Sequence, residues 1–164
     1  MKALVAYYSD TGNTEKLARA LCEAIHFENE IKSIPEIQSA DGYDIIFCGF
    51  PVQAQSVPRK AQDFIKGLPA GQKVAFFSTH GSLRGGQLPR QAFEHAIGLA
   101  SKASVLGHFG CRGQVRQNII DALMKKPEHK AWAEEALSAA GHPDSQDLAD
   151  GKKFAQEMLA KMSR

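Results

Sequence analysis

Residues 3–21, ALVAYYSDTGNTEKLARAL, decide the fold of this chain of 164 residues. The apolar run 3–8 shows no polar alternation, which is typical of a parallel strand that is covered on both faces. Apolar residues recur at helical spacing within 15–24, so a helix is expected to follow the strand. The polar turn between them, SDTGNT at 9–14, would aim free backbone N–H groups and the positive end of the helix dipole at one point. This arrangement predicts an anion site, and its hydroxyls suit a phosphate.

The turn differs from the two commoner phosphate-binding motifs. No GxGxxG follows the strand, as a dinucleotide-binding turn would require, and no GxxxxGK[ST] supplies a lysine for the outer phosphates of a nucleotide. Such a turn would hold a phosphate with neutral donors, which are the backbone amides and the side chains of Ser9, Thr11, Asn13 and Thr14. An ordinary helix N-cap is the plain alternative, but a cap needs only one hydroxyl.

Composition is that of an ordinary globular protein, with 43% hydrophobic and 23% charged residues, and the length suits a single domain over residues 1–164. The 20 basic and 18 acidic residues leave a net charge of +2, and no basic run interleaved with aromatic residues indicates nucleic-acid binding. Three scattered cysteines, Cys22, Cys48 and Cys111, indicate reduced thiols and a cytoplasmic location. No apolar segment predicts a membrane span or a signal peptide.

The rest of the chain alternates between apolar strands and amphipathic helices. Further strands are expected at 30–34, 45–50, 73–78 and 104–111, and further helices at 59–68, 88–103, 114–126, 129–140 and from Asp144 or Ser145 onward. Continuous apolar strands in this order predict an α/β fold with a parallel sheet covered on both faces. Ligands bind beyond the carboxyl ends of such strands, so three loops would meet at one rim: 9–14, 51–55 and 79–87.

An apolar strand that ends in S-x-T-G-N-T and opens a helix resembles the FMN phosphate loop of flavodoxins. The stretch Y-D-x-x-x-x-G-x-P at 43–51 and the stretch KVAFFSTHG at 73–81 are similar to the segments that carry the family's two flavin loops. HPDSQDL at 142–148 resembles a stretch before the last helix in a less studied branch of flavodoxin-like proteins. The resemblance implies a flavodoxin-like, doubly wound, five-stranded parallel sheet in the order 2-1-3-4-5, with helices on both faces.

By that resemblance the bound group is FMN. The expected cofactor-binding residues are Ser9, Asp10, Thr11, Gly12, Asn13 and Thr14 for the phosphate, Pro51, Val52, Gln53 and Ala54 for one side of the flavin ring, and Thr79, His80, Gly81, Ser82, Arg84 and Gly85 for the other. His80 is interpreted as a flavin contact rather than a local turn residue. For Arg84, stabilisation of the reduced flavin's charge and an ordinary solvated loop position remain equally open.

Flavodoxins generally sandwich the ring between a Trp and a Tyr on these two loops, and this chain has neither residue there. Trp132 is expected on a late helix, where we interpret it as packing against the body of the fold. Cys111 is interpreted as a structural thiol at the end of the fifth strand, next to Arg112. A ring without the aromatic clamp would be held less tightly and would be more open to a second reactant.

The sequence therefore favours an FMN-binding electron-transfer protein that works with a redox partner or a separate reductase of unknown identity. One alternative is an FMN-dependent oxidoreductase that reduces a small conjugated acceptor such as a quinone. The missing clamp, the Gly-rich loop at 79–87 and the lack of acidity favour this alternative. The second alternative is a cofactor-free, partner-binding domain, against which the intact phosphate loop argues. Neither a nucleic acid nor a membrane is expected as a partner.

Overall fold

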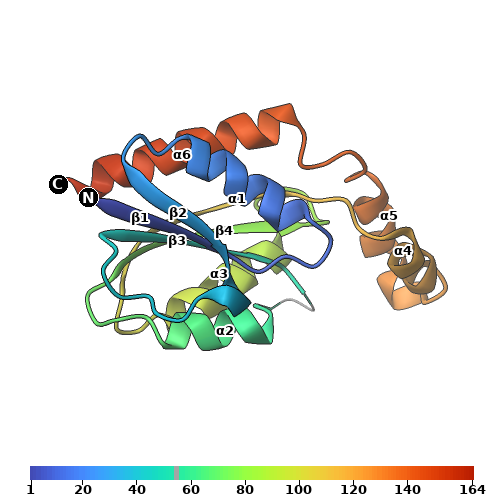
Figure 1. Ribbon diagram of the computed structural model, residues 1–164. Coiled ribbons are helices and arrows are strands. Elements are labelled where there is room, and N and C mark those ends of the chain that lie inside the picture. The colour runs from blue at the N-terminus through green and yellow to red at the C-terminus, as the bar shows by residue number, and fades with distance from the viewer. Residues whose placement is uncertain (54–55) are drawn as a thin grey trace.

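A parallel sheet of five strands forms the centre of the computed structural model, which describes residues 1–53 and 56–164 (Figure 1). The strands are β1 (Lys2–Tyr7), β2 (Glu28–Ser33), β3 (Ile45–Pro51), β4 (Lys73–His80) and β5 (Ser104–Arg112). They lie in the order β2-β1-β3-β4-β5, and all neighbours are parallel. This confirms the predicted flavodoxin-like fold.

Helices cover both faces of the sheet, as the continuous apolar strands predict (Figure 1). Helices α1 (Asn13–Glu23) and α6 (Ser145–Met162) bury Leu17 and Phe154 against one face. Helices α2 (Arg59–Lys66) and α3 (Gln87–Leu99) bury Ile65 and Phe93 against the other face. Within each central strand, consecutive side chains enter alternate cores, so that Phe76 and Phe77 of β4 are both fully buried but on opposite sides.

Two short helices extend beyond the carboxyl edge of the sheet, away from both covering layers (Figure 1). They are α4 (Gln117–Met124) and α5 (Lys130–Leu137), joined through the 3₁₀ turn η2 (Pro127–His129). They pack on each other around a small core of their own, made by Ile120, Ala133 and Ala136. We call this pair of helices the α4–α5 unit; a second 3₁₀ turn, η1 (Ile34–Glu36), follows β2.

Three strands run further at their carboxyl ends than the sequence predicted: β3, β4 and β5, the last of which includes Arg112. Pro51 was expected to leave the sheet but is the last residue of β3, in register with Thr79 of β4. A proline is tolerated there because β1 pairs with β3 only as far as Gly49. An N–H group at Pro51 would therefore have no carbonyl of β1 as its acceptor, and its absence breaks no hydrogen bond of the sheet. The next residue, Val52, resumes pairing by donating its N–H to the Thr79 carbonyl at 2.9 Å. Thr79 and His80 consequently end a strand rather than begin a loop.

Among the described residues, none of the helices is both long enough and apolar enough to cross a lipid bilayer.

Gly49 is required by the close packing of β3 on its neighbour. A Cβ atom at this position would lie 2.0 Å from the ring of Phe77, which is fully buried. We therefore expect Gly49→Ala to lower the free energy of unfolding by about 1–3 kcal/mol, because the core cannot yield to the added methyl group. Urea unfolding followed by circular dichroism measures the change.

The matched control is Gly98→Ala, on the exposed side of α3, where a Cβ would meet no atom within 4 Å. This control should keep or raise stability by up to about 1 kcal/mol, because alanine favours the helix over glycine. Equal stability changes for the two variants would contradict the packing argument.

Candidate functional site

The turn between β1 and α1 presents backbone donors that the protein itself does not use. Gly12 is the N-cap of α1, and its φ of 95° belongs to the left-handed region that glycine adopts without strain. The Ser9 hydroxyl accepts a hydrogen bond from the Gly12 N–H at 3.1 Å, and this bond within the turn stabilises its conformation. Within the described chain, the N–H groups of Thr11, Asn13 and Thr14 donate to no acceptor. They lie at the positive end of α1, which is the arrangement that an anion site requires.

Two side chains of this turn also tie it to distant parts of the chain. Thr14 Oγ1 lies 2.9 Å from Thr79 Oγ1, in a buried hydrogen bond that joins the start of α1 to the end of β4. Asn13 Nδ2 donates to the Gln114 carbonyl at 3.0 Å, just after β5. The turn is therefore held in place against two strand ends of the same rim.

A cation that the sequence did not place here lies beside the turn. Arg116 precedes α4, and its guanidinium is 3.5 Å from a carboxylate oxygen of Asp10. Both side chains are about half exposed, so water screens the pair and its contribution to stability is small. Its electrostatic effect is local, because Arg116 offsets the carboxylate of Asp10, which would repel an anion at this turn.

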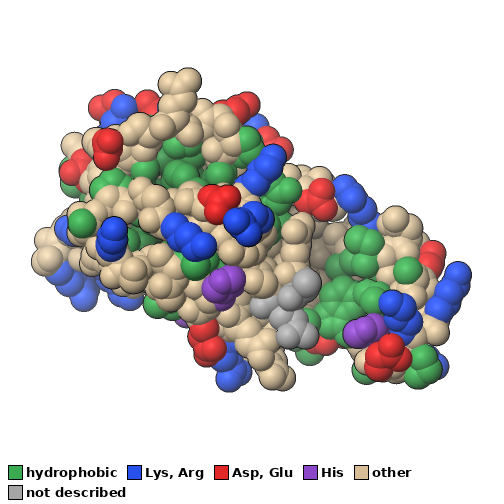
Figure 2. Space-filling view, turned by 90° about the horizontal axis from the view of Figure 1, so that it is seen from below, with side chains coloured by type: hydrophobic (Ala, Val, Ile, Leu, Met, Phe, Trp, Pro, Cys, Tyr) green, Lys and Arg blue, Asp and Glu red, His purple; other side chains and the backbone are tan. Residues whose placement is uncertain are grey.

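A cavity of about 670 Å³ opens at the same rim, which is a usual size for a small-molecule site. Five of its lining residues lie on or after β3 and β4, where the sequence predicted the flavin ring, and the others come from α3 and from the chain after β5. The lining residues are Val52, Gln53, His80, Gly81, Ser82, Leu88, Val115, Ile119, Leu123, His129 and Trp132. Figure 2 shows hydrophobic side chains gathered on the α4–α5 unit beside the hollow that separates it from the body of the protein.

His80 is buried in the wall of this cavity. Its Nδ1 lies 2.8 Å from the Ser82 carbonyl, which can only accept a hydrogen bond, so Nδ1 carries the proton. Burial lowers the pKa of His80 from its ordinary value, and this outweighs the opposite effect of the bond to Ser82. His80 is therefore a neutral imidazole at pH 7, and it both holds the turn and lines the cavity.

Four described residues of the set predicted for the flavin ring do not line the cavity: Pro51, Thr79, Arg84 and Gly85. Arg84 turns toward α6 and pairs with Asp147 at 2.7 Å and with Asp150 at 2.8 Å, so its charge is already matched by carboxylates. Gly85 lies in the following turn with a φ of 73°, outside the cavity lining. Ala54 falls outside the residues that the structure describes. The positive charge of Arg84, which was considered for the edge of the flavin, thus attaches the loop after β4 to α6.

The apolar wall formed by the α4–α5 unit was missed by reasoning from the sequence. Trp132, which was interpreted as packing against the body of the fold, lines the cavity. The apolar stripe of α4 was visible in the sequence, but it serves two surfaces: Ile120 enters the small core of the unit, whereas Ile119 and Leu123 line the cavity. A helical stripe predicts that one face is covered, and it does not show which other segment faces it.

Arg112, the last residue of β5, fastens the α4–α5 unit to the rim. Its guanidinium donates to the carbonyls of Gly81 and Ser82 on the loop after β4, at 3.2 Å each. It also donates to the Glu135 carbonyl at 2.9 Å and to the Ser138 carbonyl at 3.2 Å, at the carboxyl end of α5. A cation at this end of a helix satisfies free carbonyls and complements the helix dipole. Arg112 therefore holds the loop and the wall of the cavity in one geometry.

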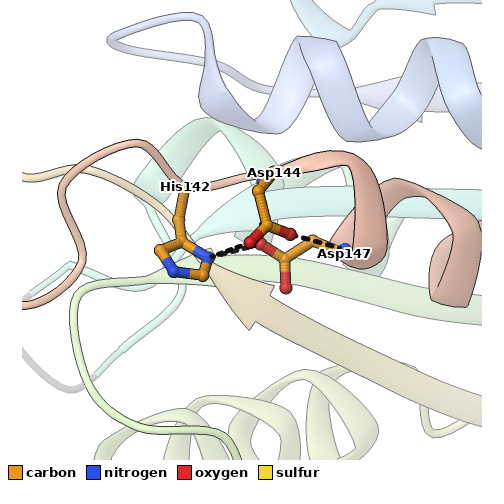
Figure 3. A group of neighbouring side chains, drawn as sticks. All are labelled: His142, Asp144 and Asp147. Atoms are coloured by element: carbon orange, nitrogen blue, oxygen red, sulfur yellow. Dashed lines mark hydrogen bonds and ion pairs between the residues drawn. The ribbon is translucent and has the colours of Figure 1, made fainter.

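A His–Asp cluster begins α6 and supports the same loop from the other side (Figure 3). Asp144 and Asp147 form a reciprocal capping box, and His142 Nδ1 lies 2.5 Å from Asp147 Oδ2. Burial alone would raise the pKa of Asp147, but hydrogen bonds from the Asp144 N–H, His142 and Arg84 lower it below its usual value. Because both oxygens of Asp147 already have partners, we assign the cluster a structural role rather than that of a metal site.

Cys111 is fully buried, as befits the structural thiol that the sequence indicated. Burial raises its pKa to about 12, so the reactive thiolate is not populated near neutral pH.

Fold and site together define a doubly wound α/β protein with free backbone N–H groups in the described turn after its first strand and a cavity of small-molecule size at the same edge of the sheet. The family model described as "Flavodoxin domain" matches residues 4–156. The chain therefore belongs to the flavodoxin domain family.

Similar proteins extend this picture. The chain is 27% identical over 175 residues to the flavodoxin-like domain-containing protein BilS of Clostridioides difficile (strain CD3), with 99% of each chain covered. It is similar in structure to oxidised Flavodoxin 2 from Bacillus cereus, with a TM-score of 0.66, 22% identity and coverage of 98% and 99%. A flavoprotein from Lactobacillus acidophilus NCFM, solved in complex with FMN, matches with a TM-score of 0.55 and 23% identity over 66% of this chain and 92% of its own. These structural likenesses show a shared fold.

Replacing Asp147 by Asn tests the attachment of the loop to α6. Asp147→Asn should lower the free energy of unfolding by about 2 kcal/mol at neutral pH, since it removes charged hydrogen bonds. Because native contacts lower the pKa of Asp147, this contribution is complete above the unfolded pKa of about 4 and is lost as the pH falls through the lower native pKa. Urea unfolding between about pH 3 and pH 7 should show the gap between wild type and variant narrowing with acid. A gap that stays constant would contradict this interpretation.

Replacing Arg112 by Ala tests the attachment of the α4–α5 unit. Amide hydrogen exchange in α4 and α5 should quicken by about tenfold or more, whereas exchange in β1 and β3 should change little, because local opening follows the lost contacts. Arg112→Lys, which keeps the charge but not the fork of donors, should give an intermediate result. Arg19→Ala is the control, since Arg19 forms only an exposed pair with Glu15 on α1. If α4 and α5 exchange as slowly as in the wild type, Arg112 does not hold the unit.

Proposed function

We propose that this protein binds FMN non-covalently and transfers electrons between redox partners. The single observation that carries the proposal is the set of unused N–H donors of Thr11, Asn13 and Thr14, aimed at the rim beside the cavity. Membership of the flavodoxin domain family and the FMN-bound fold relative support it. The partner would be a redox protein or a reductase.

The residues present fit this cofactor. A phosphate needs several donors at one point, and the turn supplies backbone N–H groups at a helix N-terminus, with Arg116 offsetting the charge of Asp10 nearby. A flavin ring is flat and amphipathic, so it needs apolar walls and polar backbone partners at its edge. The cavity offers apolar side chains on α4 and backbone groups at Gly81 and Ser82. When bound, FMN would supply one- and two-electron chemistry, which the protein's own side chains lack.

A second candidate function is direct reduction of a small conjugated acceptor. The observation that favours it is the apolar wall of the α4–α5 unit, where Ile119 and Leu123 line the cavity. Such a wall excludes water and suits a planar apolar molecule. Oxidation of NAD(P)H with turnover of a quinone by the isolated protein would favour this candidate, and turnover only in the presence of a protein partner would favour electron transfer.

An absorbance spectrum of the purified protein, repeated during titration with FMN and with riboflavin, tests cofactor binding. FMN should bind more tightly than riboflavin, because riboflavin lacks the phosphate. Thr11→Ala should weaken FMN binding by about tenfold and leave riboflavin binding unchanged, since one hydrogen bond to a charged group is lost. The described structure gives the exposed Thr11 side chain no partner, so the fold should be unaffected.

The matched control is Thr11→Ser, which keeps the hydroxyl and should bind FMN as the wild type does. A protein that binds no FMN under any of these conditions would instead support the cofactor-free, partner-binding alternative.

A further inference from the structure

The α4–α5 unit brings one large aromatic side chain to a cavity whose loops have none. Trp132 is the only tryptophan of the chain. It lines the cavity together with His80 and Gly81, which lie at the end of β4. Its Cζ2 atom is 3.8 Å from the position that a Cβ of Gly81 would take, so the indole lies beside the loop after β4. The tightest neighbour of that position is Val115, whose Cγ2 would lie 2.5 Å from the Cβ, so the missing side chain at Gly81 makes room for Val115.

Packing within the helical unit accounts for only part of this side chain, although Trp132 does pack against the core of Ile120, Ala133 and Ala136. The Trp132 Nε1–H is buried without a hydrogen-bond acceptor among the described residues, and a buried donor without a partner costs free energy. A phenylalanine would fill the same space without this cost. What the indole offers in addition is a broad aromatic face, and part of the side chain remains exposed along the cavity.

The position of the indole is fixed by contacts on both sides of the cavity rim. Arg112 bonds both the loop carbonyls and the carboxyl end of α5, which carries Trp132. In the reverse direction, the Glu135 carboxylate of α5 accepts a hydrogen bond from the Leu83 N–H at 2.9 Å. Trp132 is therefore held against the loop before any ligand arrives, and such preorganisation lowers the cost of binding.

We infer that Trp132 is a cofactor-contacting residue, whose indole forms an aromatic wall against the flavin ring from a helix outside the two flavin loops. This inference rests on the proposed function, because it concerns the ring of the same cofactor. Stacking between an aromatic side chain and a flat heterocycle favours contact through offset faces. The wall would replace the aromatic residues that are missing from 51–53 and 79–82.

Fluorescence and affinity of the full chain test the inference without a measurement of activity. Contact with an indole quenches flavin emission, so FMN bound to the wild type should be nearly dark, and its emission should rise several-fold in Trp132→Ala. The same variant should bind FMN and riboflavin about tenfold more weakly, by an equal factor for both, because the lost contact is to the ring and not to the phosphate. Trp132→Phe keeps an aromatic face and should bind FMN within about threefold of the wild type.

Leu137→Ala is the matched control, because Leu137 is an apolar residue of the same helix that is 43% exposed and does not line the cavity. It should change neither the emission nor the affinity. If FMN binds to the wild type but Trp132→Ala leaves its affinity and emission unchanged, the inference is wrong and the proposed function stands. If the wild type binds no FMN, both fail. If Trp132→Ala does not fold, the wild type and Trp132→Phe still test the inference. Bright emission from FMN bound to the wild type would overturn it. Equal emission from FMN bound to the wild type and to Trp132→Phe would also overturn it.

Discussion

Parallel pairing of all five strands is the constraint on which the site depends. Every strand ends at the same edge of the sheet, so the segments after β1, β3, β4 and β5 meet there whatever their sequences are. The buried bond between Thr14 and Thr79 and the bond from Asn13 to Gln114 are consequences of this topology. The two apolar cores on the faces of the sheet supply the rigidity that keeps these loop residues in register.

Arg112 fastens the helical unit that encloses a cavity at this shared edge. Loops at a sheet edge are open to solvent unless another element covers them, and here the cover is the α4–α5 unit. The unit buries only a small core of its own around Ile120, which is too little to fix its position. Hydrogen bonds from one guanidinium to two loop carbonyls and to the end of α5 provide the orientation instead. The geometry of the cavity thus depends on a polar contact more than on apolar burial.

Local patterns predicted the fold well, because its elements arise within short segments. The apolar runs specified buried strands, and the SDTGNT turn specified free N–H groups at a helix N-terminus. The other wall of the cavity could not be predicted, since Trp132 and Gly81, which both line it, lie far apart in the chain. Arg84 was misleading for the same reason: its carboxylate partners lie on α6, some 60 residues later, and no local signal indicates that its charge is already matched.

Under the proposed function, one segment would bind the phosphate of the cofactor and another would surround its ring: the turn after β1 and the α4–α5 unit. The turn at 9–14 joins β1 to α1, whose buried residues belong to the core on one face of the sheet. The wall belongs to a helical pair with a separate core, attached through one arginine and one loop. Substitutions at Ile119 or Leu123 therefore alter what the cavity accepts without touching the sheet. Under the proposed function, selectivity for a second reactant or a partner would reside in the α4–α5 unit, whereas retention of the phosphate would reside in the turn at 9–14.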